Sequence, residues 1–225
     1  MSEAFSPHLE MLPPEQQVIW PQLEPLAKLG FVLYGGTAIA LRIGHRVSVD
    51  FDFFSDQPLD YAALQESCPF FEGATVLQDH PNTVTVLVPV DGVDGGQVKL
   101  SFFGSIDFGR VGEPGLTGDQ VMLVASLNDL MATKVKTVLQ RLEAKDYRDI
   151  AAMIAADVSL SGGLAAACEM YGSVFQPAES LKALTYFEGG DLHTLTEKEK
   201  NILVTMVGKI NGLPQARILS RKLAG

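Results

Sequence analysis

The sequence predicts an α+β protein whose first half mixes strands with helices and whose second half is helical. Short apolar or alternating segments, separated by glycine, proline and asparagine, predict strands between residues 31 and 103. After residue 119 the apolar positions recur with helical spacing. The chain is therefore expected to form a mixed domain over residues 1–120 and a helical domain over residues 121–225.

In the first half, a helix is expected over residues 13–28, kinked or split by Pro21 and Pro25. A strand over 31–34 leads through Gly35-Gly36-Thr37 into a short helix that Gly44 closes. A strand over residues 49–54 and a helix over 59–67 follow. A three-stranded meander is then expected, with strands at 74–78, 83–90 and 97–103 and turns at 80–82 and 91–96.

In the second half, Ser126 is expected to cap a helix that runs to about residue 142. Thr196 and Glu199 form a capping box at the start of a later helix. The remaining helices are expected over residues 145–156, 163–171, 177–187 and 196–211.

The composition is that of a globular protein with a core, because 47% of the 225 residues are hydrophobic and 20% are charged. The two cysteines, Cys68 and Cys168, exclude a disulfide framework and match no zinc-binding spacing. We find neither a signal peptide nor an apolar run of membrane-spanning length. The sequence is therefore expected to be cytoplasmic, with no membrane partner.

The net charge of −10 argues against broad, non-specific nucleic-acid binding. The charge is uneven, because residues 1–133 hold 5 basic and 17 acidic groups, whereas residues 134–225 hold 12 and 10. Basic residues gather where the second half begins, at Lys134, Lys136, Arg141, Lys145 and Arg148. The net charge therefore does not exclude a local basic face that binds a triphosphate or an RNA end.

Asp50 and Asp52 form the clearest candidate site, because residues two apart on a strand point to the same face. Val49, Phe51 and Phe53 would then face the core. Two adjacent carboxylates repel each other, and a divalent cation removes that cost. Oxygen ligands of this kind suit Mg²⁺ or Mn²⁺.

Gly35 and Gly36 lie where a strand passes into a helix, and such a glycine-rich helix start can bind phosphate. Thr37 can add a hydroxyl donor. Taken alone, Gly-Gly is more often a plain turn, and two aspartates on a strand are more often a solvated edge. Their occurrence together within fewer than twenty residues favours a site for a nucleoside triphosphate and a metal.

Residues 35–54 closely resemble the opening motif of the AbiEii/AbiGii toxin family, which belongs to the DNA polymerase β-like nucleotidyltransferase superfamily. A second block, residues 127–134 followed by Arg141 and residues 145–149, looks like the helical motif of that family. The resemblance implies a nucleotidyltransferase-like small mixed sheet flanked by helices, followed by an all-α region. The C-terminal helices match nothing in the resemblance.

The resemblance also implies roles for single residues. Gly35, Gly36 and Thr37 would hold the triphosphate, and Asp50 and Asp52 would hold Mg²⁺. For Arg46 two roles stay open, a bidentate contact with phosphate or bracing of the aspartate pair. The other implied residues are Ser48 at a motif position, Lys134 at a phosphate, Arg141 at the nucleotide, and Asp146 as a base or orienter of the attacking group.

One departure from the superfamily pattern concerns a third carboxylate, which such enzymes typically carry on a neighbouring strand. The candidate strand, residues 97–103, offers Gln97, Lys99 and Ser101 on its polar face and no acid. Asp107 lies beyond the strand. The missing acid favours a second reading, in which the protein binds a nucleotide or a partner without catalysis.

The first functional hypothesis is a Mg²⁺-dependent nucleotidyltransferase of the AbiEii toxin type. The resemblance implies transfer of a nucleotide from a nucleoside triphosphate to an acceptor, with tRNA as a candidate, and a cognate antitoxin as a partner. The alternatives are the catalytically degenerate binding module and a nucleotidyltransferase for a small molecule such as an aminoglycoside.

Overall fold

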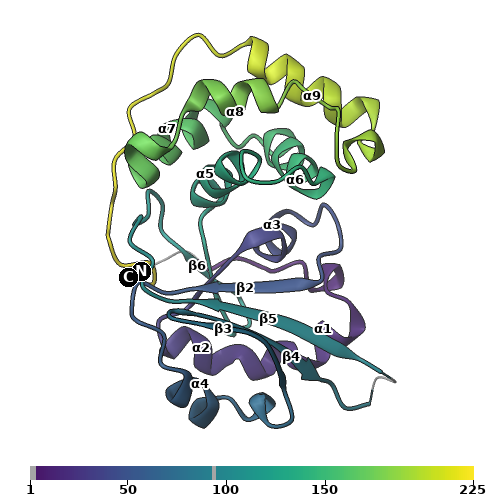
Figure 1. Cartoon of the computed structure of the whole chain (residues 1–225), viewed down its shortest axis with the longest axis vertical. Helices are drawn as coiled ribbons and strands as arrows, with labels where there is room; N and C mark the ends of the chain where they lie inside the picture. Colours follow the sequence, from purple (N-terminus) through teal and green to yellow (C-terminus); the bar gives the residue numbers. More distant parts are fainter. Residues whose placement is uncertain (1–3, 93–94) are drawn as a thin grey trace. The chain divides into compact units, whose positions relative to one another are not determined.

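The computed structural model describes residues 4–92 and 95–225, and the chain divides into two compact units (Figure 1). The sheet unit consists of the described parts of Met1–Gly109, Glu113–Ala125 and Ser220–Gly225. The helical unit consists of Arg110–Gly112 and Ser126–Leu219. The mixed α/β character expected from the sequence is confirmed, whereas a boundary at residue 120 stays a prediction.

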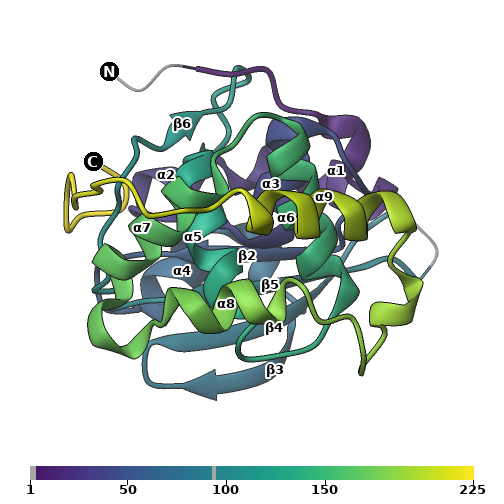
Figure 2. The same ribbon diagram turned by 90° about the horizontal axis from the view of Figure 1, so that it is seen from above.

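Within the described residues, seven strands form one mixed sheet in the order β3-β4-β5-β2-β1-β7-β6. The neighbouring strands β3, β4, β5 and β2 can be followed in Figures 1 and 2. The central strand β2 is antiparallel to β1 and parallel to β5. The predicted meander is confirmed, because β3, β4 and β5 pair in antiparallel order. The strands are β1 (Val32–Tyr34), β2 (Asp50–Phe54), β3 (Thr75–His80), β4 (Thr83–Pro89), β5 (Gln97–Phe103), β6 (Gly115–Leu116) and β7 (Leu123–Val124).

Strands β6 and β7 were not predicted, because two residues each are too few to show an alternating pattern. The turn expected over residues 91–96 lies partly outside the described residues. Asn82 takes a φ of 58° in the turn that joins β3 to β4, as the turn signal at 80–82 predicted.

One face of the sheet carries the core of the sheet unit, in which Phe51, Phe53 and Phe102 are fully buried. Trp20 stacks on Phe51 with ring centroids 6.1 Å apart. Helices α1 (Pro14–Ile19), α2 (Glu24–Lys28) and α4 (Tyr61–Ser67) lie on this side of the sheet (Figure 1). The predicted split of the first helix is confirmed, because a 3₁₀ turn over Trp20–Leu23 separates α1 from α2.

Val49 does not face the core, and the sequence-based prediction for it is wrong. Val49 keeps 61% of its surface exposed to solvent. The alternating pattern extends to Val49 in the sequence, but β2 begins only at Asp50. The side chain is therefore not held by the pleat of the strand that buries Phe51 and Phe53.

In the helical unit, the capping box at Thr196 and Glu199 is confirmed. Helix α5 is shorter than predicted, because it ends at Thr137 and a turn follows. Helix α9 lies beside α6 (Figure 2). The helices are α5 (Leu127–Thr137), α6 (Ala144–Ala155), α7 (Leu160–Tyr171), α8 (Pro177–Ala183) and α9 (Glu197–Gly208).

Residues 220–225 belong to the sheet unit although they follow the helical unit in the sequence. Leu223 is buried, and its backbone N–H donates to Asp56 Oδ1 at 2.8 Å. Arg221 Nη1 donates to the backbone carbonyl of Asp107 at 3.1 Å. Among the described residues, no helix has the length and apolar character needed to cross a membrane.

Candidate active site

Strand β2 presents Asp50 and Asp52 on the face of the sheet opposite the core. Phe51 and Phe53 are 0% exposed, whereas the two aspartates between and before them are half-buried. The Asp50 side chain keeps 34% of its surface exposed. The predicted alternation along this strand therefore places both carboxylates side by side where a ligand can reach them.

Gly35 brings the start of helix α3 (Gly35–Ile43) against Asp52. Its φ of +74° is a conformation that glycine adopts without strain. A Cβ atom at this position would overlap with Asp52 Oδ2 and lie 3.2 Å from Asp52 Cγ. A residue with a side chain would therefore have to displace the Asp52 carboxylate.

Gly36 makes room in the same way for the side chains of Arg46 and Ser48. A Cβ atom on Gly36 would lie 2.6 Å from Arg46 Nη2 and 3.1 Å from Ser48 Oγ. Arg46 Nη1 also donates to the carbonyl of Val47 at 3.0 Å. A guanidinium and a hydroxyl thus lie at the first turn of α3, where the helix N-terminus carries partial positive charge.

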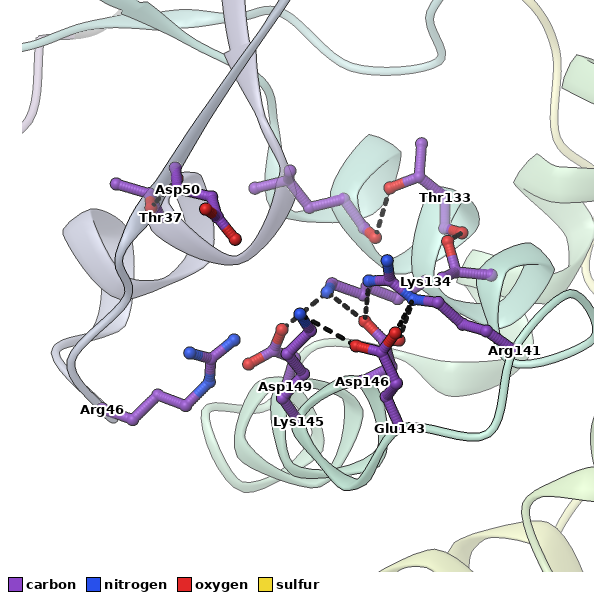
Figure 3. A network of polar contacts seen from close by, with 12 residues as sticks. Thr37, Arg46, Asp50, Thr133, Lys134, Arg141, Glu143, Lys145, Asp146 and Asp149 are labelled. Atoms are coloured by element: carbon purple, nitrogen blue, oxygen red, sulfur yellow. Dashed lines mark hydrogen bonds and ion pairs between the residues drawn. The ribbon is translucent and has the colours of Figure 1, made fainter. Parts of the chain in front are cut away.

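Thr37 is fully buried, and its hydroxyl donates to the backbone carbonyl of Asp50. This hydrogen bond ties α3 to the first residue of β2 (Figure 3). A threonine hydroxyl has one proton to donate. A contact between Thr37 and phosphate would therefore require the hydroxyl to leave Asp50.

The donor set of the aspartate pair fits Mg²⁺ or Mn²⁺. Both groups supply carboxylate oxygens, and Mg²⁺ usually binds one or two protein carboxylates while keeping waters and taking phosphate oxygens. Over residues 4–92 and 95–225, no group of three or more His, Cys, Asp and Glu could hold a metal ion by itself. Asp50 and Asp52 therefore resemble a site that a bound triphosphate completes rather than a closed protein cage.

Strand β5 contributes Lys99 and Ser101 on the same face of the sheet. The parallel register places Lys99 opposite Asp50 and Ser101 opposite Asp52. Lys99 Nζ lies 3.7 Å from Asp50 Oδ1, and Ser101 Oγ accepts a hydrogen bond from Thr85 at 3.3 Å. This face of β5 carries no acid, as the sequence predicted, and presents an ammonium group beside Asp50.

In the helical unit, Lys134 lies between two buried carboxylates (Figure 3). Its Nζ is 2.6 Å from Asp146 Oδ1 and 2.7 Å from Asp149 Oδ2, and both aspartate side chains are 0% exposed. Asp149 was not predicted as a site residue. Asp149 follows Asp146 by three residues, which puts both side chains on one face of α6. This spacing in the sequence could have indicated that Asp149 lies beside Asp146.

Arg141 also joins this cluster, although it lies beyond the end of α5. Its Nε donates to Asp146 Oδ2 at 2.8 Å and its Nη2 to Asp146 Oδ1 at 3.1 Å. The sequence predicted a helix to about residue 142, which would have included Arg141, and this is wrong because α5 ends at Thr137. The turn after the helix brings the guanidinium to Asp146 instead.

Asp146 has a pKa below the ordinary value of an aspartate, despite its burial. Burial raises the pKa, but the hydrogen bond from Arg141 and the positive charge of Lys134 together outweigh it. Asp146 is therefore ionised at neutral pH and accepts hydrogen bonds from both cations.

The other basic residues near Lys134 have partners of their own. Lys145 Nζ lies 2.8 Å from Glu143 Oε2, and Arg148 Nη2 donates to the carbonyl of Thr194 at 2.8 Å. Lys136 Nζ donates to the carbonyl of Val174 at 3.0 Å. The cluster of positive charge in the sequence is thus partly offset by neighbouring acids and carbonyls.

The family model described as "Nucleotidyl transferase AbiEii toxin, Type IV TA system" matches residues 23–201. The chain therefore belongs to the AbiEii nucleotidyltransferase toxin family. An uncharacterised protein of Aquifex aeolicus is 31% identical over 134 residues, which are 57% of this chain and 61% of that protein. The chain thus matches less than two thirds of the length of this relative.

The fold is also similar to that of a solved nucleotidyltransferase toxin, MenT4 from Mycobacterium tuberculosis. The TM-score is 0.57 at 13% identity, over 85% of this chain and 82% of that one. A nucleotidyltransferase-like protein from Paracoccidioides brasiliensis aligns with a TM-score of 0.45 at 16% identity, over 75% and 94% of the two chains. The likeness to MenT4 confirms the fold class that the sequence predicted.

Proposed function

We propose that this chain is a nucleotidyltransferase that transfers a nucleotide from a nucleoside triphosphate to an acceptor hydroxyl. Membership of the AbiEii family supports the reaction class. The observation that carries the assignment to residues is the glycine at position 35, which lets the start of α3 approach the Asp52 carboxylate. The helix start proposed to bind phosphate and the carboxylates proposed to bind the metal thus adjoin each other within the sheet unit.

In this proposal, the residues of the sheet unit bind and orient the triphosphate. The backbone at Gly35 and Gly36 receives phosphate oxygens, and Arg46 and Ser48, which lie against Gly36, donate hydrogen bonds to them. Thr37 holds α3 to β2 through the carbonyl of Asp50. Asp50 and Asp52 would hold Mg²⁺, which when bound neutralises charge on the phosphates and polarises the phosphorus–oxygen bond.

The acceptor oxygen attacks the α-phosphorus, and the bond from the α-phosphorus to the bridging oxygen breaks, so that pyrophosphate leaves. The hydroxyl proton passes to a base, for which we propose Asp146 because it is ionised. Lys134 and Arg141 hold its carboxylate in place through hydrogen bonds, and we propose Lys134 as the residue that contacts phosphate. In phosphoryl transfer, an aspartate can serve as the general base, and lysine and arginine stabilise the negative charge on the phosphates.

We further propose an RNA acceptor, with tRNA as the first candidate, and a cognate antitoxin as partner. The family description of a Type IV toxin–antitoxin system supports the partner. The rival readings are a binding module without catalysis, which the absence of an acid on the polar face of β5 favours, and transfer to a small molecule such as an aminoglycoside.

The test is to incubate the full chain with Mg²⁺, each of the four α-³²P-labelled nucleoside triphosphates, and total RNA, total protein or an aminoglycoside. We expect label on RNA that the Asp50→Asn and Asp52→Asn variants do not transfer. Asp79→Asn is the matched control, since Asp79 is an exposed aspartate on β3, which two strands, β4 and β5, separate from β2. Label on the aminoglycoside alone would support the small-molecule enzyme, and nucleotide binding without any transfer would support the module.

A further inference from the structure

An open groove lies in the helical unit between α6 and α9, two helices that pack side by side (Figure 2). Its volume is about 650 Å³, which is within the range of small-molecule sites in proteins. Ile154 and Ala155 line it from the end of α6, and residues of α9 between Lys198 and Met206 line it from the other side. The reaction proposed above uses none of these residues, so the groove is a separate candidate site.

The residues that α9 contributes lie on one face of that helix. They have the spacing of a single helical face, at Lys198, Asn201, Ile202, Thr205 and Met206. Ile202 and Met206 are half-buried and Ile154 of α6 is buried, so these three side chains give the groove an apolar surface. From Lys198 to Met206 the helix rises by about 12 Å. The groove therefore suits an elongated ligand with an apolar body.

Lys198 places a positive charge at one end of this face. Among the described residues that line the groove, it is the only charged one. The neighbouring acids have other partners, because Glu197 pairs with Lys200 at 2.9 Å and Glu199 accepts hydrogen bonds at the helix cap. No ion pair of Lys198 occurs within residues 4–92 and 95–225. Since the first turn of a helix also carries partial positive charge, this end of the groove favours an anionic group.

The apolar surface and the single lysine distinguish between classes of ligand. Nucleic acid is held by several cationic contacts with phosphates, and the groove offers one such contact. A second copy of this face would bring no acid to Lys198, because no described residue that lines the groove is acidic. A straight-chain carboxylate supplies both an anionic end and an elongated apolar body.

We propose that the groove between α6 and α9 binds a free straight-chain carboxylate, of the chemical class of fatty acids. Its carboxylate lies at Lys198 and the first turn of α9, and its alkyl chain lies along Ile202, Met206 and Ile154. The groove belongs to the helical unit alone, so this inference does not depend on the proposed nucleotide transfer.

The test is isothermal titration calorimetry of the full chain with hexanoate, octanoate and decanoate, each below its micellar concentration. We expect the affinity to rise about fourfold for each two methylene groups added, as for groups half removed from water. Lys198→Gln should weaken the binding of decanoate about three- to fivefold. Lys182→Gln is the matched control and should leave the affinity unchanged, because Lys182 is exposed on α8 and does not line the groove. Equal affinities for the three carboxylates, or no binding of decanoate, would overturn the proposal.

A second pair of variants tests where the ligand lies. Thr205→Glu puts an acid among the lining residues and should weaken the binding of decanoate about fivefold. Val204→Glu adds the same charge one residue away, at an exposed position outside the groove, and should leave the affinity unchanged. Equal effects of the two substitutions would refute this location. Urea unfolding checks that each variant is folded.

Nuclear magnetic resonance of ¹³C-labelled methionine methyl groups gives an independent readout. Decanoate should shift the signal of Met206 and leave that of the buried Met131 in place. An unshifted Met206, or binding of decyltrimethylammonium as tight as that of decanoate, would contradict the proposal. Binding of the chain to phosphatidylglycerol vesicles without binding of decanoate would overturn it in favour of a membrane surface.

Discussion

The space that a Cβ atom of Gly35 would need is filled by the carboxylate of Asp52. Tyr34 on β1 pairs with Asp52 on β2. This pairing fixes the position of Gly35, the residue after Tyr34, relative to Asp52. The carboxylate of a proposed metal site and the first residue of a proposed phosphate-binding helix are therefore coupled sterically. Changing either should disturb the other.

We expect Gly35→Ala to abolish nucleotide transfer and to destabilise the fold by about 1–2 kcal/mol, because alanine is strained at a positive φ. The added methyl group also displaces Asp52. Mn²⁺ titration and urea unfolding measure the two effects separately. Gly92→Ala is the control, since Gly92 has a φ of +81° and open space around it. If Gly35→Ala binds Mn²⁺ as the Gly92→Ala variant does, the steric coupling is refuted.

We expect Lys134→Met to destabilise the protein by about 3–5 kcal/mol, because it removes the cation between two buried carboxylates. Lys145→Met should cost less than about 1 kcal/mol, since the side chains of Lys145 and its partner Glu143 are both partly exposed to solvent. Urea unfolding of both variants makes the comparison. Equal losses of unfolding free energy in the two variants would show that the buried ion pairs of Lys134 stabilise the protein no more than the pair of Lys145 does.

Asp146 should make the stability of the protein fall in acid. Its pKa is lower in the folded state than the ordinary 3.8, so the folded state favours the ionised form. The corresponding stability is fully present above pH 3.8 and is lost as the pH falls through the folded-state pKa. Urea midpoints measured between neutral and acid pH should therefore fall less steeply for Asp146→Asn than for the unmodified protein. Parallel curves would contradict the assignment, and Asp79→Asn controls for the loss of an aspartate.

Gly163 allows α7 to pack closely on α5, because a Cβ atom there would overlap with Met131 Cγ and lie 2.9 Å from Met131 Cβ. We expect Gly163→Ala to cost about 1–3 kcal/mol through overpacking. Adding Met131→Ala should remove the overlap with Met131 Cγ and leave only the 2.9 Å contact with Cβ, so a double-mutant cycle should show coupling. Gly208→Ala in α9 meets no atom within 4 Å and should be neutral or stabilising. Additive losses at positions 163 and 131 would argue against the contact.

The centre of the sheet was predictable because β2 alternates between half-buried and buried residues, and Phe51 and Phe53 identify its core face. The proline positions likewise predicted the division of the first helix. Val49 shows the limit of this reasoning, since an alternating pattern cannot tell where pairing with neighbouring strands ends. Strand β7 depends on pairing with the distant β1 and strand β6 on pairing with β7, and two residues each leave no alternating pattern.

The site was predictable only in part. Spacing on β2 placed Asp50 and Asp52 together, and the motifs pointed to Lys134 and Asp146. The neighbour of Asp50 on β5 depends on the register between strands distant in sequence, so Lys99 was noted only as a residue that is not an acid. Arg141 reaches Asp146 through a turn, a geometry that helical periodicity does not describe.

Residues 220–225 complete the sheet unit after the helical unit has been made, and this order has a consequence for biosynthesis. The ribosome synthesises the chain from its N-terminus, and domains fold as they emerge from it. Asp56 and Asp107 therefore acquire their partners Leu223 and Arg221 only when translation has passed the last helix. The unit that carries Asp50 and Asp52 therefore reaches its final structure only after residues 126–219 have been synthesised.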